Sequence, residues 1–176
     1  MAKMNPDWKK FKELELNNTL IGLWKGFKFP DLYWTPPGAT VIAWNRSLHY
    51  CFIAGFDDTV FCVNPDNEID KQIYPVARSF TDFLRLILAT GTADLIYPAI
   101  NMTREEFEAA LKDPKAEEAR NEPETLKVLN GIREAFNLQQ MENPYGYLET
   151  LQSGFAYETL PLSPAHRASI ENNKQN

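Results

Sequence analysis

The chain has two histidines and two cysteines, and His49, Cys51 and Cys62 lie close together in the sequence. His49 stands two positions before Cys51, which places both side chains on the same face if this segment is a strand. An imidazole so placed could stabilise a thiolate, the form in which cysteine acts as a nucleophile. The three side chains together could also supply three ligands to a zinc ion. Two kinds of chemistry, nucleophilic catalysis and metal binding, are therefore open at this segment.

The segment that carries these residues is predicted to be a β-hairpin. Leu48–Ala54 and Thr59–Val63 are β-prone runs on either side of residues 55–58, Gly-Phe-Asp-Asp, which favour a turn. With those four residues as the loop, the facing pairs would be Cys51 with Cys62, Phe52 with Phe61, and Ile53 with Val60. Both faces of the hairpin are then apolar, so we expect it to be central in a sheet and covered on both sides.

In that register His49, Cys51 and Cys62 would share a face with the aliphatic pair Ile53 and Val60, which is a pattern typical of a core. Buried cysteine mostly behaves as a small hydrophobic residue. Packing is therefore the favoured interpretation, and we predict no catalytic residue, metal ligand or cofactor. The alternative is a pocket near His49 and Cys51 that binds a small ligand or serves a hydrolase.

Other catalytic signatures are missing from the sequence. It contains no Gly-x-Ser-x-Gly elbow, P-loop, glycine-rich dinucleotide turn or His-Glu-x-x-His motif. A loose acidic series lacks the spacing and the glycine of a calcium-binding loop, and turn formation explains most of it. The series consists of Asp57, Asp58, Asp66, Glu68 and Asp70. Chemistry at paired carboxylates is thus not predicted.

Aromatic residues are concentrated between residues 24 and 44, and most of them should be core. The six are Trp24, Phe27, Phe29, Tyr33, Trp34 and Trp44. Residues 30–38, which contain three prolines, favour a loop. Tyr and Trp in loops are the side chains that most often anchor protein–protein contacts. Tyr33 and Trp34 are therefore candidate partner-binding residues.

The charge of the chain is also unevenly distributed. The formal net charge is −6, which argues against nucleic-acid binding, because phosphate recognition uses clusters of Lys and Arg. From Glu105 to Glu124 there are eight acidic residues against three basic ones. This segment is either a solvated helix face or a surface that attracts a basic partner. The candidate binding residues are Glu105, Glu106, Glu108, Glu117 and Glu118.

Length and composition indicate an ordinary globular domain in the cytoplasm. The chain has 176 residues, of which 44% are hydrophobic and 24% charged. No apolar run approaches the roughly 18–20 residues of a membrane helix, and residues 1–12 are too polar for a signal peptide. We therefore expect a cytoplasmic protein with reduced cysteines.

The clearest predicted helix follows Ser79, an N-cap residue, with Asp82 reaching back to complete a shortened capping box. Its apolar stripe is Phe80, Phe83, Leu84, Ile87 and Leu88, and Gly91 should end it. A shorter helix should run from Pro6 to Leu16, and strands are expected at 39–44 and within 69–76. Three further helices are expected. The first opens at Thr103, which forms a capping box with Glu106. The second opens at Pro123, with Leu126, Leu129, Ile132 and Phe136 facing inward, and the third opens at Pro144.

We expect residues 1–162 to form one domain, with the helices after about residue 103 packed on the sheet. Residues 163–176 are polar and are expected to be a frayed tail.

The run from Cys51 to Gly91 resembles the SUKH superfamily. The residues that carry the likeness are Phe61-Cys62-Val63-Asn64-Pro65-Asp66, Tyr74-Pro75-Val76-Ala77, and Ser79-Phe80-Thr81-Asp82-Phe83-Leu84. The resemblance implies an α+β fold with a bent antiparallel sheet and helices packed around it. It also implies a non-enzymatic protein-binding module, such as an adaptor or a bacterial immunity protein that neutralises a toxin. The partner that the resemblance implies is another protein, for example a basic toxin domain such as a nuclease.

Overall fold

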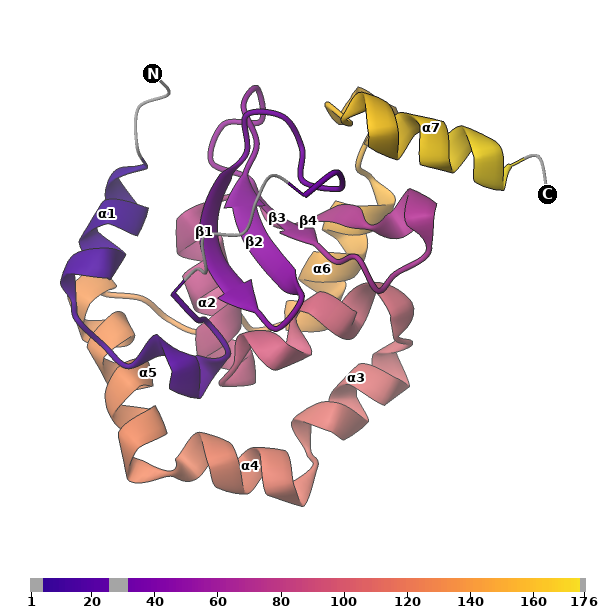
Figure 1. The fold of residues 1–176 in the computed structure, drawn as a ribbon. Coiled ribbons are helices and arrows are strands. Elements are labelled where there is room, and N and C mark those ends of the chain that lie inside the picture. Colours follow the sequence, from indigo (N-terminus) through magenta and orange to yellow (C-terminus); the bar gives the residue numbers. More distant parts are fainter. Residues whose placement is uncertain (1–4, 26–31, 175–176) are drawn as a thin grey trace.

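The computed structural model describes residues 5–25 and 32–174, and it has the predicted α+β architecture. A four-stranded antiparallel sheet lies among helices, and its strands follow one another in the order β1-β2-β3-β4 (Figure 1). The strands are β1 (Thr40–Asn45), β2 (Leu48–Phe52), β3 (Val60–Val63) and β4 (Ile73–Ala77). Each strand thus pairs with the strand before it in the chain.

The register of the β2–β3 hairpin differs by one residue from the predicted one. Tyr50 pairs with Cys62, and Cys51 pairs with Phe61. The segment between the two strands, residues 53–59, is longer than the predicted four-residue loop, and within it Gly55 (φ +93°) and Asp57 (φ +49°) adopt left-handed conformations. Within this loop Phe56 folds back onto Phe61, with ring centroids 5.3 Å apart. Since paired residues share a face, Cys51 and Cys62 lie on opposite faces of the sheet, and the predicted Cys51–Cys62 pairing is wrong.

Both faces of the hairpin are covered, as predicted. One face carries Tyr50, Cys62 and Tyr74, which belong to the large core around α2 (Phe80–Thr90). The other face carries Cys51, Phe61 and Val63 in a second, smaller core. That second core is closed by loop and C-terminal residues, namely Trp34, Ala39, Phe56, Phe155, Tyr157 and Leu162.

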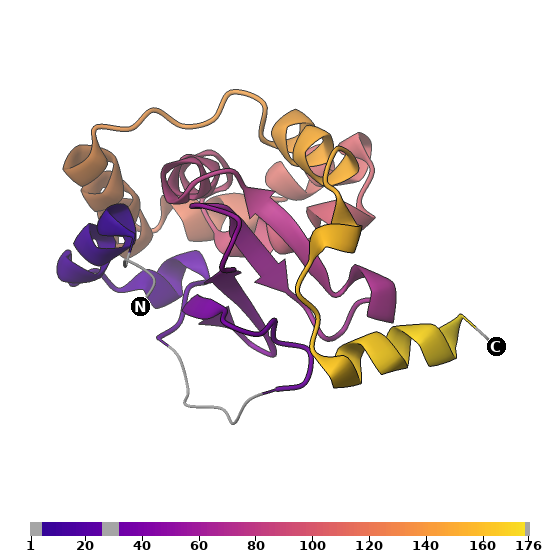
Figure 2. The same cartoon turned by 90° about the horizontal axis from the view of Figure 1, so that it is seen from above.

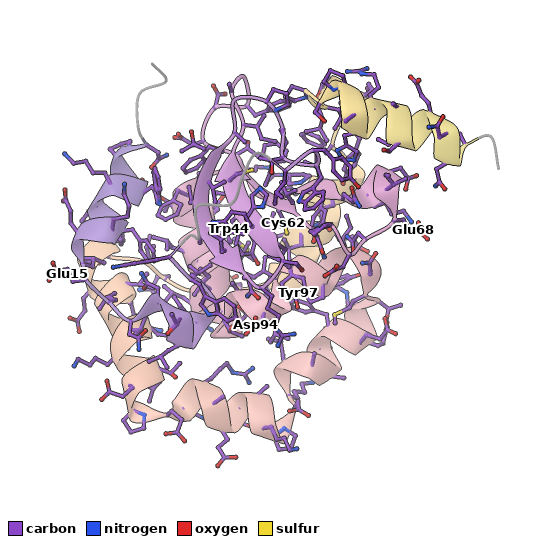
Figure 3. The ribbon with its side chains drawn as sticks, viewed as in Figure 1. Glu15, Trp44, Cys62, Glu68, Asp94 and Tyr97 are labelled. Carbon is purple, nitrogen blue, oxygen red and sulfur yellow. The ribbon has the colours of Figure 1, made fainter. Side chains whose placement is uncertain are left out.

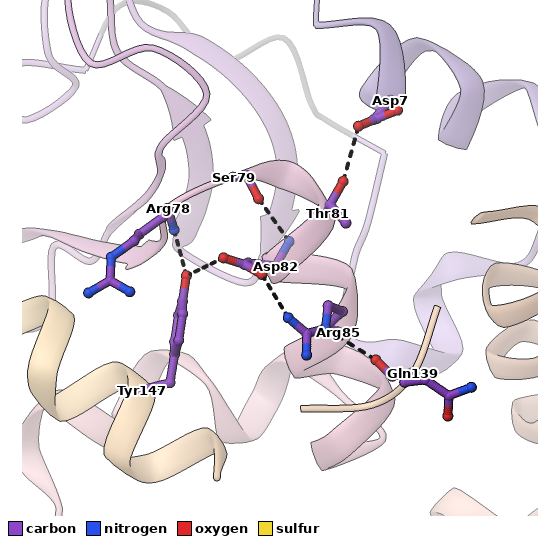
Figure 4. Close-up of polar contacts among 8 residues, drawn as sticks. All are labelled: Asp7, Arg78, Ser79, Thr81, Asp82, Arg85, Gln139 and Tyr147. Carbon is purple, nitrogen blue, oxygen red and sulfur yellow. Dashed lines mark hydrogen bonds and ion pairs between the residues drawn. The ribbon is translucent and has the colours of Figure 1, made fainter. Parts of the chain in front are cut away.

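Helix α2 forms as predicted, except at its capping box. The Ser79 hydroxyl accepts a hydrogen bond from the backbone N–H of Asp82 (3.1 Å), and Gly91 ends the helix at φ +77°. The Asp82 carboxylate does not return to the N-cap. It instead accepts hydrogen bonds from Arg85 (3.2 Å) and from the hydroxyl of Tyr147 (2.9 Å), as Figure 4 shows. Asp82 therefore connects α2 to a later helix.

The remaining helices have these bounds: α1 Pro6–Glu13, α3 Arg104–Leu111, α4 Pro114–Asn121, α5 Pro123–Phe136, α6 Pro144–Ser153 and α7 Pro164–Asn173. Short 3-10 helices are η1 Asn18–Ile21, η2 Ile69–Lys71, η3 Ala93–Leu95, η4 Tyr97–Asn101 and η5 Tyr157–Thr159. Helix α1 stops before the predicted Leu16 because Glu15 takes a left-handed conformation (φ +50°).

The helices after residue 103 were expected to pack on the sheet, and α6 does so. Helix α6 packs on β4, where Gln152 donates a hydrogen bond to the Pro75 carbonyl (3.2 Å) and the Tyr147 hydroxyl accepts one from Arg78 N–H (2.8 Å). Helix α5 packs instead on α2 and η1, with Thr125 and Val128 buried and the predicted stripe residue Leu126 exposed. In Figure 2 an extended segment joins α5 to α6. The backbone N–H of Met141 on this segment donates a hydrogen bond to the backbone carbonyl of Arg85 in α2 (3.2 Å).

The C-terminal residues form helix α7 rather than the predicted frayed tail. Ser163 accepts a hydrogen bond from the backbone N–H of His166 (3.1 Å), and Pro164 occupies the first turn. His166 is buried, and its Nε2 lies 3.2 Å from the carbonyl oxygen of Ile69 in η2. One buried side chain in a polar helix leaves little periodic signal in the sequence, which is why the helix was missed.

Within the described residues, no single helix is long and apolar enough to cross a membrane. Phe80–Thr90 and Ala93–Asn101 pass such a test only as a pair, and they are bent by 94°.

Candidate interaction surface

Helix α3 is built by local sequence signals and held by one aromatic side chain. The predicted capping box is present: Thr103 Oγ1 accepts a hydrogen bond from Glu106 N–H (3.2 Å), and Glu106 Oε2 accepts one from Thr103 N–H (2.7 Å). Phe107 is the buried residue of this helix, and its ring lies 5.6 Å from that of Tyr145 in α6. Leu111 is half-buried against the large core, and the face of α3 that carries Glu105, Glu106 and Glu108 is left to solvent.

Helix α4 buries no residue at all. Its N-terminus is capped by Asp113, whose Oδ1 accepts hydrogen bonds from Lys115 N–H (3.1 Å) and Ala116 N–H (3.0 Å). Near its C-terminus the stem of Arg120 lies on Gly91, and its guanidinium donates a hydrogen bond to the carbonyl of Leu111. A Cβ at position 91 would stand 2.0 Å from Arg120 Cδ, so glycine is required there for contact as well as for backbone conformation.

The five candidate glutamates lie on this pair of helices, and all of them are exposed. Helices α3 and α4, here called the acidic arm, run along the lower edge of the molecule in Figure 1, and Figure 3 shows side chains projecting from them away from the sheet. None of the five makes an ion pair with a described residue. Glu106 alone has a structural role, since its carboxylate completes the capping box.

Tyr33 and Trp34 do not join the acidic arm. Their rings contact each other edge to face at 4.7 Å, and Tyr33 also lies 6.2 Å from the ring of His166 in α7. The Tyr33 carbonyl accepts a hydrogen bond from Ser163. Because α7 and α4 lie at opposite ends of the molecule in Figure 1, the two predicted groups form separate surfaces.

The two aromatic residues also differ from each other in exposure. Tyr33 is 44% exposed, whereas Trp34 is half-buried and packs against the second core. Tyr33 therefore has the exposure of an anchor, and Trp34 is mainly part of the fold. Two of the other aromatic residues considered in the sequence, Phe27 and Phe29, lie outside the described residues.

The His49 and Cys51 neighbourhood is buried. Both side chains are fully shielded from solvent, and burial raises the pKa of the Cys51 thiol well above its usual range. Burial lowers the pKa of His49 from 6.5 to about 4, so its imidazole is neutral at pH 7 and offers no charge to a thiolate. Both ring nitrogens of His49 lack a hydrogen-bond partner among the described residues, and its ring lies 4.7 Å from that of Trp44. This geometry does not favour a cysteine nucleophile.

Cys62 is separated from this pair by the sheet. Figure 3 labels it within the sheet, where it faces the large core, and burial raises the pKa of its thiol to about 12. No group of three His, Cys, Asp or Glu side chains suited to a metal ion occurs in the described ranges 5–25 and 32–174.

Two members of the loose acidic series between residues 57 and 70 make hydrogen bonds to other segments of the chain. Asp58 Oδ1 accepts a hydrogen bond from the Asn5 side chain (2.7 Å), and Asp66 Oδ2 accepts one from Ser47 (2.8 Å).

Sequence reasoning missed the contact between Arg120 and Gly91 that holds the arm. The one available signal was a glycine ending α2, and nothing local indicated which residue would cover it.

Comparison of the chain with models of known protein families, with curated proteins and with solved structures gives no match. The relation to the SUKH superfamily thus remains a resemblance carried by the residues named above.

Proposed function

We propose that this chain is a non-enzymatic protein-binding module, comparable to a SUKH-type immunity protein, and that its acidic arm contacts a basic partner protein. The observation that carries the proposal is that α4 buries no residue although it is capped and anchored. Because none of its side chains is fully buried, most of the surface of this helix is available to a partner.

The charge of the arm suits such a partner. Residues 105–124 carry three basic and eight acidic residues, which is a net charge of −5. Exposed charges act over a Debye length of about 8 Å at physiological ionic strength, so clustered glutamates attract a cationic surface before contact. Association with the partner is then fast and sensitive to salt.

A nuclease domain fits this chemistry. Enzymes that hold a phosphate backbone present Lys and Arg at the surface where the nucleic acid lies. An acidic arm that docks on that surface occupies the place of the substrate. Inhibition of a nuclease toxin therefore requires no catalytic group from this chain, and none of the candidate catalytic residues is accessible.

The test begins with capture of partners from lysate of the source cells at low salt, followed by measurement of association rates with the purified partner. The arm variant carries Glu105→Gln, Glu108→Gln, Glu117→Gln and Glu118→Gln. Glu106 is left in place because its carboxylate completes the capping box of α3. We expect the captured protein to be basic, and the association rate to fall at least about tenfold in the arm variant at low ionic strength.

A matched control has the same change in net charge elsewhere. It carries Glu134→Gln, Glu142→Gln, Glu158→Gln and Glu171→Gln, all at exposed positions outside the arm. The control should associate nearly as fast as the unaltered chain. If both variants associate equally slowly, the effect is due to net charge alone. If the arm variant associates as fast as the unaltered chain, the arm is not part of the interface. Either result overturns the proposal.

A further inference from the structure

A pocket of about 530 Å³ is lined by residues that belong to neither helix of the acidic arm. Its walls come from η2, η4 and α6, together with Met102 and Tyr157. This volume falls within the range of about 300–1,000 Å³ that is typical of small-molecule sites. Neither His49 nor Cys51 lines it, so it is distinct from the buried neighbourhood considered above.

The aromatic walls of the pocket are fixed before any ligand arrives. The Tyr145 hydroxyl donates a hydrogen bond to the Met102 carbonyl (2.8 Å), and the guanidinium of Arg104 lies 5.0 Å from the centre of the Tyr145 ring. The ring of Tyr157 lies edge to face against Phe155 at 5.1 Å. Two tyrosines held in this way offer a preformed surface for a flat apolar group, which lowers the entropic cost of binding.

One polar group in the pocket is left without a partner. The Tyr157 hydroxyl makes no hydrogen bond to a described residue, whereas that of Tyr145 does. A phenol is protonated at neutral pH and burial raises the pKa of Tyr157 further, so this hydroxyl can donate or accept a hydrogen bond.

The charged residues of the pocket leave an excess of negative charge. Asp70 comes from η2 and Glu149 from α6, and both are exposed at the pocket. Lys71 is the basic residue among its walls, but its ammonium group lies 2.9 Å from Glu68. Glu149 has only a longer contact with Arg104, at 3.8 Å, and Asp70 has no ion pair with a described residue. A cation is therefore the complementary charge.

We propose that this pocket binds a small amphipathic cation in which an aromatic ring is joined by a short chain to a protonated amine. The ring lies against Tyr145 and Tyr157 and the apolar side chains of Ile100 and Met102. The ammonium group lies toward the carboxylates of Asp70 and Glu149. The inference does not depend on the acidic arm.

The test uses three probes that share one ring system and differ in charge: tryptamine, the neutral tryptophol and the anion indole-3-propionate. Binding is followed by methyl NMR of Met102 and Ile100 and by titration calorimetry. A fragment of this size, with the binding efficiency per heavy atom of a drug-sized ligand, should bind with a Kd of about 2 mM. We expect tryptamine to bind about tenfold more tightly than tryptophol, and the anion to bind most weakly.

Variants of the pocket separate charge from shape. Combined Asp70→Asn and Glu149→Gln should bring the affinity for tryptamine down to that for tryptophol, while Glu142→Gln, outside the pocket, should change nothing. Tyr157→Ala should lower the affinity for tryptamine and the affinity for tryptophol by the same factor. The proposal is overturned if the three probes bind equally, if the methyl signals of Met102 and Ile100 do not shift, or if the double variant keeps its preference for the amine. The arm variant serves as an independent control and should retain binding of tryptamine.

Discussion

Helices α2 and α4 are both capped at their N-termini, yet different forces hold them in place. Helix α2 buries seven of its eleven residues between the sheet and α5, whereas α4, with eight residues, buries none. Ser79 caps the first and Asp113 the second, and both helices meet where Arg120 covers Gly91. The comparison shows that α2 is held in place by its packing in the core. Helix α4 is held by its N-cap and by the side chain of Arg120, and its surface stays exposed.

The largest expected effect comes from truncating a buried side chain of α2. Phe83 is fully buried, and its ring lies 4.9 Å from that of Tyr50. Phe83→Ala should lower the free energy of unfolding by about 3–5 kcal/mol, because it leaves a cavity as well as losing apolar contact. Glu118→Ala in α4 should change it by less than about 0.5 kcal/mol. Urea denaturation of both variants measures this, and a loss below about 1 kcal/mol for Phe83→Ala would contradict the role assigned to α2.

The second test asks whether the pH dependence of stability resides in the core. His49 has a folded-state pKa of about 4, below its ordinary value of 6.5. The unfolded chain therefore takes up the proton first, and stability that is fully present above pH 6.5 is lost as the pH falls toward 4. At about 1.4 kcal/mol per pKa unit, the loss from this residue approaches roughly 3 kcal/mol.

The measurement is the free energy of unfolding of the chain and of His49→Gln between pH 7 and pH 4. The difference between the two slopes isolates His49, since other titrating groups are common to both proteins. Parallel slopes would show that His49 becomes protonated without cost, and would contradict its burial as a neutral group.

The smallest test compares the two caps directly. Ser79→Ala removes the acceptor for Asp82 N–H, and should lower the free energy of unfolding by about 1 kcal/mol. Asp113→Ala removes an equivalent cap from α4, but we expect little change in global unfolding and faster hydrogen exchange at Lys115 and Ala116. If Asp113→Ala destabilised the whole chain as much as Ser79→Ala, the arm would be part of the cooperative core.

Local patterns predicted α2, α3 and the hairpin strands, because their signals lie among near neighbours in the sequence, but α4 and α7 were not predicted. The stripe and Gly91 of α2, the capping box at Thr103, and the exposure of the acidic segment all follow from spacing of a few residues. The hairpin register could not be predicted, since the loop length depends on Phe56 packing onto a distant surface. The same limit applies to the candidate sites: only the tertiary fold places Tyr33 beside His166 and away from the glutamates.

The order of the strands has a consequence for synthesis of the chain on the ribosome. Each strand after β1 pairs with the strand made just before it, so the backbone pairing of the sheet uses no residue beyond Ala77. The outer edge of β4, however, is covered by Tyr147 and Gln152 of α6, which are made later. Translation from Ala77 to Ser153 takes roughly 4–15 s at about 5–20 residues per second. During that interval the nascent sheet has an open edge, which is where a chaperone or a neighbouring nascent chain would bind.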